Sequence, residues 1–274
     1  MKQRIITGFV LALIFIPLLF LPAFWFSLVV GAMAIIASAE FFFMVQKKEN
    51  ISHGLVVFSI LFTLALYTTS RIMFDDITLA PWIMLVLVIE MVVVLSLLVL
   101  KQTMNVDVMS KLFFGTLYVA LPFATLAYIQ SLGLMILLYL LIIVMFTDSF
   151  ALFVGLRFGK RKLAPVLSPK KSVEGALGGL FFAVLFATVY AVVFNIFDIE
   201  LTVLNVLLHV LLGVIISIIA QMGDLIASSF KRSHGIKDFS PIFPGHGGVL
   251  DRFDSTLFAS MVLGVVIMAM ERLL

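Results

Sequence analysis

Long apolar stretches follow one another along almost the whole chain and restrict it to a membrane fold. A transmembrane helix needs about 20 predominantly apolar residues, and the sequence holds about nine such stretches. They span residues 5–21, 24–45, 54–70, 81–100, 110–131, 133–155, 175–197, 201–222 and 255–273. A count of eight stays open, because only Pro22 separates the first two and only residues 131–133 separate the fifth from the sixth. We therefore expect an all-α fold, a polytopic integral membrane helical bundle with about nine transmembrane helices.

The composition excludes several classes of protein. Hydrophobic residues make up 63% of the chain, charged residues make up 12%, and the mean hydropathy is +1.25. A soluble globular protein carries about 25% charged residues. The absence of cysteine excludes disulfide bonds, thiolate catalysis and cysteine-ligated zinc. The basic N-terminus and the apolar run after it resemble a secretory signal. That run is too long and no small-residue cleavage site follows promptly, so we expect a retained first helix.

The lysines and arginines predict the orientation in the membrane. Basic residues of membrane proteins gather in cytoplasmic loops. With nine helices and a cytoplasmic N-terminus, all but Arg71 and Arg272 of the 18 lysines and arginines fall on the cytoplasmic side. This rule also explains the net charge of +3 and the pI near 9.2, so we expect no nucleic-acid partner.

We expect a single membrane domain over residues 1–274, because no internal repeat or soluble segment interrupts the helices. Residues 1–132 would form the N-terminal transmembrane helices, and residues 133–274 a catalytic half. Two polar loops of that half, 156–174 and 223–254, would face the cytoplasm. Functional residues are expected in or beside these two loops.

Carboxylates at the expected cytoplasmic ends of the helices are the first candidates for chemistry. A charge in hydrocarbon costs several kcal/mol unless it is paired or hydrated. Asp148, Asp224, Asp251 and Asp254 all lie toward the cytoplasmic side in this topology. Mg²⁺ prefers oxygen ligands and is often held by one or two carboxylates plus substrate phosphates. The four aspartates could therefore build a site for a hard divalent cation.

The segment before the last helix adds backbone donors. Asp251 and Asp254 are three residues apart and share a face if the helix has begun there. A helix start favours carboxylates and phosphates. Residues 244–248, Pro-Gly-His-Gly-Gly, offer backbone N–H groups in a loop that can approach a ligand closely. The alternative is that the acidic residues only cap a helix N-terminus.

A polar stripe runs along the eighth stretch. At about 100° per residue its members fall within one narrow helix face. They are Ser217, Gln221, Asp224, Ser228 and Lys231. We expect this helix to continue past the membrane surface to about residue 232. The alternative is a face whose polar groups hydrogen-bond between helices, which is the role we expect for Asn205 and His209.

The basic loops and two isolated glutamates are more ambiguous. Residues 168–175, Ser-Pro-Lys-Lys-Ser-Val-Glu-Gly, could bind phosphate near a helix start. Such loops also serve topology or contact anionic lipid, and lipid contact is what we expect of residues 159–162. Glu90 either marks an ion path or is protonated between helices, and Glu40 is equally undecided.

Residues 228–255 resemble the signature of the phosphatidate cytidylyltransferase (CDP-diacylglycerol synthase) family. The matching parts stand in order as Ser228/Ser229, Lys231-Arg232, Lys237-Asp238, 244–248 and Asp251-Arg252-Phe253-Asp254. Residues 147–160 and 168–179 are also similar to the family. The sequence Phe-Ser-Pro-Ile-Phe after Asp238 departs from the small polar residues that many members have there. That departure concerns the detail of the loop.

The resemblance implies transfer of a cytidylyl group from CTP to phosphatidate, giving CDP-diacylglycerol and pyrophosphate. It also implies membrane lipid around the protein, a homodimer, dependence on Mg²⁺ with room for a second cation, and the bacterial inner (plasma) membrane with the site facing the cytoplasm. The implied metal ligands are Asp224, Asp251 and Asp254, and the catalytic set adds Lys231 and Asp148. The implied substrate-binding residues are Ser168, Lys170, Lys171, Ser172, Glu174, Arg232, Lys237, Asp238, Gly245, His246, Gly247, Gly248 and Arg252.

The implied reaction needs no general base, because a phosphate oxygen is already anionic at neutral pH. We therefore expect His246 to organise its loop or to donate to a phosphate. One rival is another membrane lipid-phosphate transferase, but the Asp-Gly pair followed by Ala-Arg of CDP-alcohol phosphotransferases is missing. A second rival is an ion-coupled transporter. Against it, the polar residues gather at one membrane face and the two halves show no repeat.

Overall fold

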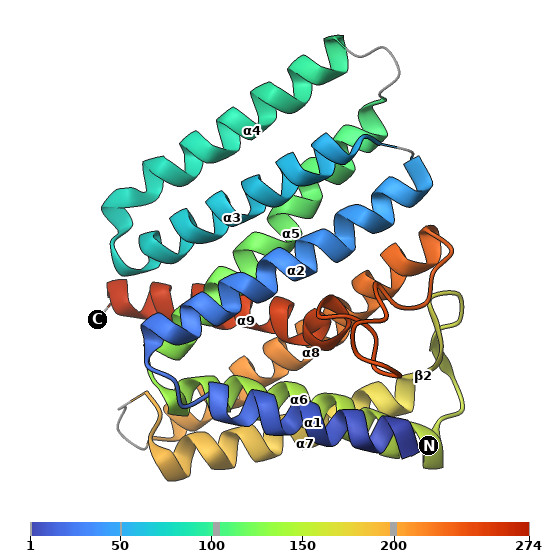
Figure 1. Ribbon diagram of the computed structural model, residues 1–274. Helices are drawn as coiled ribbons and strands as arrows, with labels where there is room; N and C mark the ends of the chain where they lie inside the picture. Colours follow the sequence, from blue (N-terminus) through green and yellow to red (C-terminus); the bar gives the residue numbers. More distant parts are fainter. Residues whose placement is uncertain (1, 50, 101–104, 198–201, 274) are drawn as a thin grey trace. The chain divides into compact units, whose positions relative to one another are not determined.

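The computed structural model describes residues 2–49, 51–100, 105–197 and 202–273, and helices dominate it (Figure 1). In chain order the first helices are α1 (Lys2–Leu18), α2 (Ala23–Glu49), α3 (His53–Asp75), the short 3₁₀-helix η1 (Ile77–Leu79), α4 (Ala80–Leu100) and α5 (Val106–Ser131). They are followed by α6 (Leu134–Phe158), strands β1 (Lys162–Ala164) and β2 (Ser168–Ser172), α7 (Val173–Phe194), α8 (Val203–Ser233) and α9 (Leu250–Leu273).

The expected bundle of membrane helices is confirmed, with one difference at the N-terminus. In the part of the chain that the structure describes, eight helices are long and apolar enough to cross a membrane. The first helix is shorter, with an apolar part over Thr7–Leu18. It ends at Leu18, and residues 19–21 form a turn before Pro22.

By its internal contacts the chain divides into two compact units. The first comprises Met1–Ser131 and Asp238–Arg252, and the second comprises Leu132–Lys237 and Phe253–Leu274. Loop 238–252 therefore belongs with the N-terminal helices. The expectation of a single membrane domain over residues 1–274 stays a prediction.

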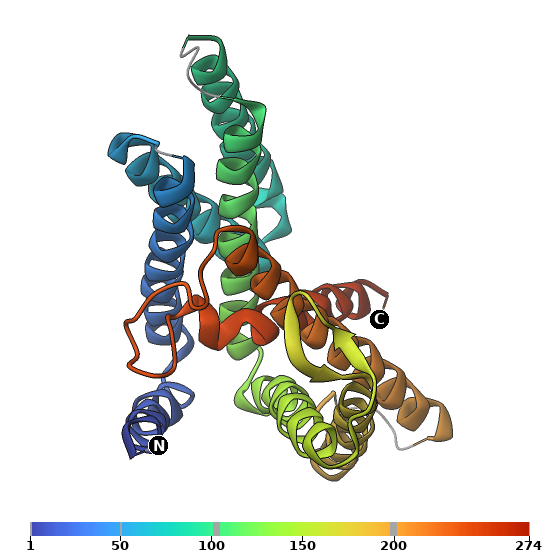
Figure 2. The same cartoon turned by 90° about the vertical axis from the view of Figure 1, so that its right-hand side faces the viewer.

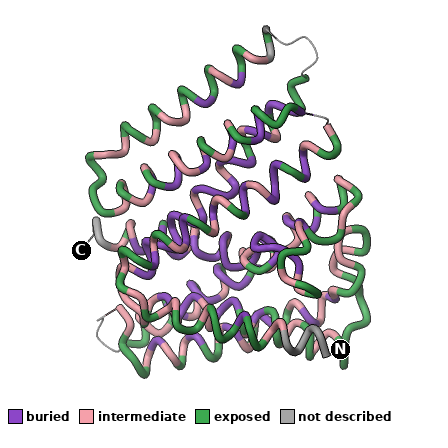
Figure 3. The backbone as a smooth tube through the Cα atoms, viewed as in Figure 1, coloured by how far each residue is buried: buried purple, intermediate pink, exposed green. Residues whose placement is uncertain are grey.

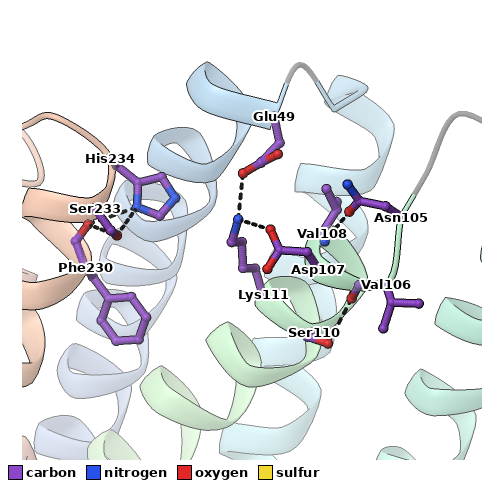
Figure 4. Close-up of polar contacts among 10 residues, drawn as sticks. All are labelled: Glu49, Asn105, Val106, Asp107, Val108, Ser110, Lys111, Phe230, Ser233 and His234. Carbon is purple, nitrogen blue, oxygen red and sulfur yellow. Dashed lines mark hydrogen bonds and ion pairs between the residues drawn. The ribbon is translucent and has the colours of Figure 1, made fainter.

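The core of the first unit lies between α2, α3 and α5, where most buried residues of this unit are found (Figure 3). Phe41 and Phe42 pack edge to face and Gly115 of α5 lies against both rings. At one end of the unit, the Lys111 ammonium bridges the carboxylates of Glu49 and Asp107 (Figure 4). These two ion pairs join the end of α2 to the start of α5.

The second unit is built on α6 and α7, which lie side by side along their length, with α8 against both. Gly175 and Gly179 of α7 face backbone carbonyls of α6, where a Cβ atom would clash with the Ala151 and Thr147 oxygens. Small residues of this kind let membrane helices approach closely. The antiparallel hairpin β1–β2 (yellow in Figure 2) contacts both helices and leads directly into α7.

Candidate active site

The polar face of α8 is turned toward the interior of the second unit. Ser217 is fully buried, and its hydroxyl lies 2.8 Å from the hydroxyl of Thr147 on α6. The Gln221 amide donates to the carbonyl oxygen of Ala176 on α7 at 3.3 Å. These two residues join three helices, as expected for interhelical hydrogen bonds. Farther along the stripe, Ser228 and Lys231 are buried and Asp224 is half-buried.

The helix α8 continues to Ser233, as the sequence predicts. The ring of His209 is buried and stacks on Phe197 with centroids 5.5 Å apart, and a hydrogen bond from this side chain to another helix stays a prediction. The Tyr139 hydroxyl donates to the His209 carbonyl oxygen at 3.4 Å. This histidine serves packing.

The second unit brings three of the predicted carboxylates together. Asp254 lies in the first turns of α9, is only 9% exposed, and interacts electrostatically with Asp224, Asp148 and Lys231. The Ser255 backbone N–H donates to Asp254 Oδ1 at 2.8 Å. Asp148 comes from α6, Asp224 and Lys231 come from α8, and Asp254 comes from α9. The carboxylates are far apart in sequence and repel one another in a partly buried place.

A second lysine approaches this carboxylate cluster from the hairpin. Lys171 of β2 forms an ion pair with Asp224, and each side chain keeps 26% of its exposure. The cluster of Asp148, Asp224 and Asp254 thus has two cationic neighbours, Lys171 and Lys231. Such a set of charges can bind a cation on its acidic side and phosphate oxygens on its basic side.

The carboxylates of the cluster fit a Mg²⁺ ion that is shared with substrate phosphates, but not one that is held by protein groups alone. Within the described ranges of the chain, no three carboxylate or imidazole groups lie close enough together to hold a metal ion by themselves. Mg²⁺ seldom requires such an all-protein cage, because one or two carboxylates plus substrate phosphates and water usually complete its shell. Asp224 and Asp254 are suited to be those carboxylates.

A glycine on α8 allows Asp254 to reach this position. A Cβ atom on Gly223 would lie 2.6 Å from the Asp254 carbonyl oxygen and 3.0 Å from the Phe258 ring. The start of α9 therefore packs on the backbone of α8 at the residue next to Asp224. The sequence alone does not reveal this contact, because an isolated glycine in a helix can have many causes.

Gly223→Ala is expected to lower turnover by about 100-fold, because the new methyl group pushes Asp254 away from its neighbours. Gly213→Ala is the matched control on the same helix, since its Cβ would meet Val184 at an ordinary 3.6 Å. The measurement is kcat of both purified variants beside the wild type. Equal kcat values for the two variants would show that the α8–α9 contact does not position the site.

Two of the residues predicted to bind phosphate, Ser172 and Glu174, form hydrogen bonds to the backbone at the ends of the hairpin. The Ser172 hydroxyl accepts from the Gly175 N–H at 3.1 Å and caps α7. The Glu174 carboxylate accepts from the Lys160 N–H at 2.9 Å and from the Arg161 N–H at 3.1 Å. It thereby holds the chain that enters β1. Ser172 and Glu174 therefore hold the hairpin together, and substrate binding by them stays a prediction. The Lys170 side chain is exposed.

A cavity of about 520 Å³ opens beside the hairpin in the second unit. Lys162, Lys170 and Lys171 line it together with Asp148 and residues of α6 and α7. Lys162 was not among the residues expected to bind substrate. The short antiparallel hairpin places it opposite Ser172, and a three-residue strand leaves little trace in a sequence dominated by helices.

The glycine-rich loop lies in the first unit and is held by two carboxylates. Glu40 of α2 is 5% exposed and accepts from the N–H groups of Val249 at 2.9 Å and Leu250 at 2.8 Å. It also accepts from the Ser240 hydroxyl at 2.5 Å. Asp251 Oδ2 accepts from the Phe239 N–H at 2.7 Å and from the Gly248 N–H at 2.9 Å.

The expectation that the backbone N–H groups of residues 244–248 are open to a ligand is therefore wrong for residues 246–248. The N–H groups of His246 and Gly247 donate to the Phe243 carbonyl oxygen, and those of residues 248–250 donate to the two carboxylates. The turn needs Gly247, whose φ is +83°. The same bonds make Asp251 and Glu40 organisers of the loop. A metal-ligand role for Asp251 stays a prediction.

The remaining predicted ligands lie at the surface or in the loop. Lys237, Asp238, Gly245 and Arg252 are exposed, and Ser168 is half-buried. Arg232 is exposed and its guanidinium donates to the Ile236 carbonyl oxygen at 2.9 Å. The half-buried His246 lies near Gly8, and its Nδ1 has no hydrogen-bond partner among the described residues. Binding of substrate by these residues stays a prediction.

Sequence similarity to known proteins identifies the family of the chain. The model of the cytidylyltransferase family matches residues 2–270. A curated phosphatidate cytidylyltransferase of Bacillus subtilis (strain 168) is 33% identical over 261 residues, which cover 94% of this chain and 94% of the relative. Proteins with the same name from Staphylococcus aureus (strain COL) and Staphylococcus haemolyticus are 32% identical over 277 residues and 33% identical over 270 residues. Those two alignments cover 97% and 98% of this chain and 99% and 100% of the relatives. With matches that run over nearly its full length, the chain belongs to the cytidylyltransferase family.

Proposed function

We propose that the chain transfers the cytidylyl group of CTP to phosphatidate and so forms CDP-diacylglycerol and pyrophosphate. The observation that carries this proposal is the carboxylate cluster of Asp148, Asp224 and Asp254 with Lys171 and Lys231 beside it, in a chain whose relatives are named phosphatidate cytidylyltransferases. The chain is an integral membrane protein with eight membrane-long helices in its described part. Its lipid substrate is therefore available in the surrounding bilayer.

The reaction joins two phosphates and needs alignment more than covalent help from the protein. An anionic oxygen of the phosphatidate phosphate attacks the α-phosphorus of CTP and forms a new P–O bond. The bond from the α-phosphorus to the oxygen bridging to the β-phosphorus breaks, and pyrophosphate leaves with the electron pair. The role of Lys171 and Lys231 is to stabilise negative charge on the phosphate oxygens during this exchange.

The carboxylates have the complementary role. Without a counter-ion, Asp148, Asp224 and Asp254 would repel a triphosphate. Asp224 and Asp254 would hold Mg²⁺, which when bound neutralises charge on the triphosphate and leaving-group oxygens. Asp148 adds negative charge to the same place and so favours a cation there. We include in this proposal that the site can hold a second cation and that Asp251 serves as a metal ligand.

The proposed setting follows from the basic residues and from the relatives. We place the chain in the plasma membrane of a bacterium with the carboxylate cluster toward the cytoplasm, where CTP is dissolved. A homodimer is part of the same proposal. No described contact favours the transporter or a different lipid-phosphate transferase.

The test is product formation by the purified protein in detergent. With CTP, phosphatidate and Mg²⁺ we expect CDP-diacylglycerol, detected by mass spectrometry, and no product when either substrate is omitted. Replacing phosphatidate with diacylglycerol or a polyprenyl phosphate tests other lipid acceptors. Consumption of one of those with no reaction of phosphatidate would contradict the proposal, as would solute transport into liposomes with no nucleotide consumed.

A further inference from the structure

The cavity beside the hairpin has two chemically different walls. The hairpin contributes Lys162, Lys170 and Lys171, and α6 contributes Leu152 and Leu156. With about 520 Å³ it is large enough for a phosphate group and the part of a ligand next to it. It lies wholly within the second unit, and Asp148 of the carboxylate cluster also lines it.

The cationic wall is created by the pairing of β1 with β2. Lys162 stands opposite Ser172 in the antiparallel register. Lys170 precedes Ser172 by two residues in β2 and lines the same cavity as Lys162. Neither the Lys162 nor the Lys170 side chain has a hydrogen bond or an ion pair among the described residues. Two such ammonium groups over one cavity favour an anion with more than one charged oxygen.

The apolar wall restricts what that anion can be attached to. Leu152 and Leu156 are 59% and 78% exposed on α6, a helix long and apolar enough to cross a membrane. A nucleoside triphosphate has polar groups along its length and gains little from such a surface. A phosphate monoester of diacylglycerol carries a doubly ionisable phosphate at one end and acyl chains at the other. It matches both walls.

On the basis of the proposed function, we infer that this cavity binds phosphatidate, with Lys162 and Lys170 at its phosphate and Leu152 and Leu156 beside the start of its acyl chains. Lys171 then stands between the two parts of the site. It lines the cavity and also pairs with Asp224. A lipid phosphate that replaces part of this ion pair comes to lie beside the carboxylate cluster, where the nucleotide's α-phosphorus must be.

The test separates the two substrates by their KM values. Lys162→Ala with Lys170→Ala is expected to raise KM for phosphatidate by about tenfold or more, since two charge-assisted contacts are lost. KM for CTP should stay within about twofold of the wild-type value. Arginine at both positions should restore much of the affinity. Lys160→Ala is the matched control, because this exposed lysine lies in the same loop and does not line the cavity.

A second variant tests the apolar wall and distinguishes a lipid from a free phosphate. Leu156→Gln should raise KM for long-chain phosphatidate and leave KM for a short-chain, soluble phosphatidate nearly unchanged. Inhibition by inorganic phosphate should weaken in the lysine variant and stay unchanged in Leu156→Gln.

Three results would overturn the inference. One is a rise in KM for CTP with no rise for phosphatidate, which would assign the cavity to the nucleotide and leave the proposed function intact. Another is an equal effect of Lys160→Ala, which would indicate general surface charge. A third is the absence of CDP-diacylglycerol with the wild type, which would remove the proposed function and this inference with it.

Discussion

Asp254→Asn is expected to lower kcat by about 1000-fold, the size of effect seen when a group that stabilises transition-state charge is removed. The side chain is nearly buried and interacts with Asp148, Asp224 and Lys231. Asparagine has almost the same shape, and its oxygen can still accept from the Ser255 N–H. The fold should therefore persist while the negative charge that would hold a cation is lost.

Asp224→Asn is expected to lower kcat by a similar factor. It also removes the ion-pair partner of Lys171. Asp75→Asn is the matched control, because this carboxylate pairs with Arg71 on α3 and is 61% exposed. The measurements are kcat at saturating CTP and phosphatidate, and the thermal unfolding midpoint in detergent. Turnover within about threefold of wild type in both site variants would remove the cluster from the mechanism.

Glu40→Ala is expected to destabilise the protein by about 3 kcal/mol, because a buried donor left without its acceptor costs about 1–3 kcal/mol. Three donors depend on this carboxylate, the N–H groups of Val249 and Leu250 and the hydroxyl of Ser240. The unfolding midpoint should fall by about 10 °C. Activity should fall as well, since the loop and the start of α9 lose their attachment to α2.

Glu40→Gln is the sharper version of this test. Both carboxylate oxygens accept backbone N–H groups, so the amide NH₂ of glutamine must face a donor. We expect a smaller but clear loss of stability. Glu49→Gln on the same helix is the control, because Lys111 keeps Asp107 as a partner and the cost should be about 1 kcal/mol or less. Wild-type midpoints for both Glu40 variants would contradict the structural role of this residue.

The helices and most of the carboxylate cluster follow from simple sequence rules. Long apolar runs give the membrane helices, and the spacing of Ser217, Gln221 and Asp224 places them on one helix face. The structure then brings Asp224 together with Asp148 and Asp254. The start of α9 at Leu250 rather than near residue 255 was less predictable, since Glu40 supplies the acceptors for its first N–H groups.

The residues that the sequence did not reveal act through long-range contacts. Glu40 lies in an apolar run more than 200 residues before Val249 and Leu250, so no local pattern links them. Gly248 is needed because a side chain there would overlap the Glu40 carboxylate. Lys162 was also not evident from the sequence, because it reaches the cavity only when its strand β1 pairs with β2.

Pyrophosphate release measured side by side for the wild type, Asp224→Asn, Asp254→Asn and Asp75→Asn tests the central claim most directly. For the wild type and Asp75→Asn we expect one pyrophosphate per CDP-diacylglycerol, dependent on both substrates and on added Mg²⁺. For Asp224→Asn and Asp254→Asn we expect almost no pyrophosphate release at an unchanged unfolding midpoint. Full release by folded Asp224→Asn and Asp254→Asn proteins would contradict the claim.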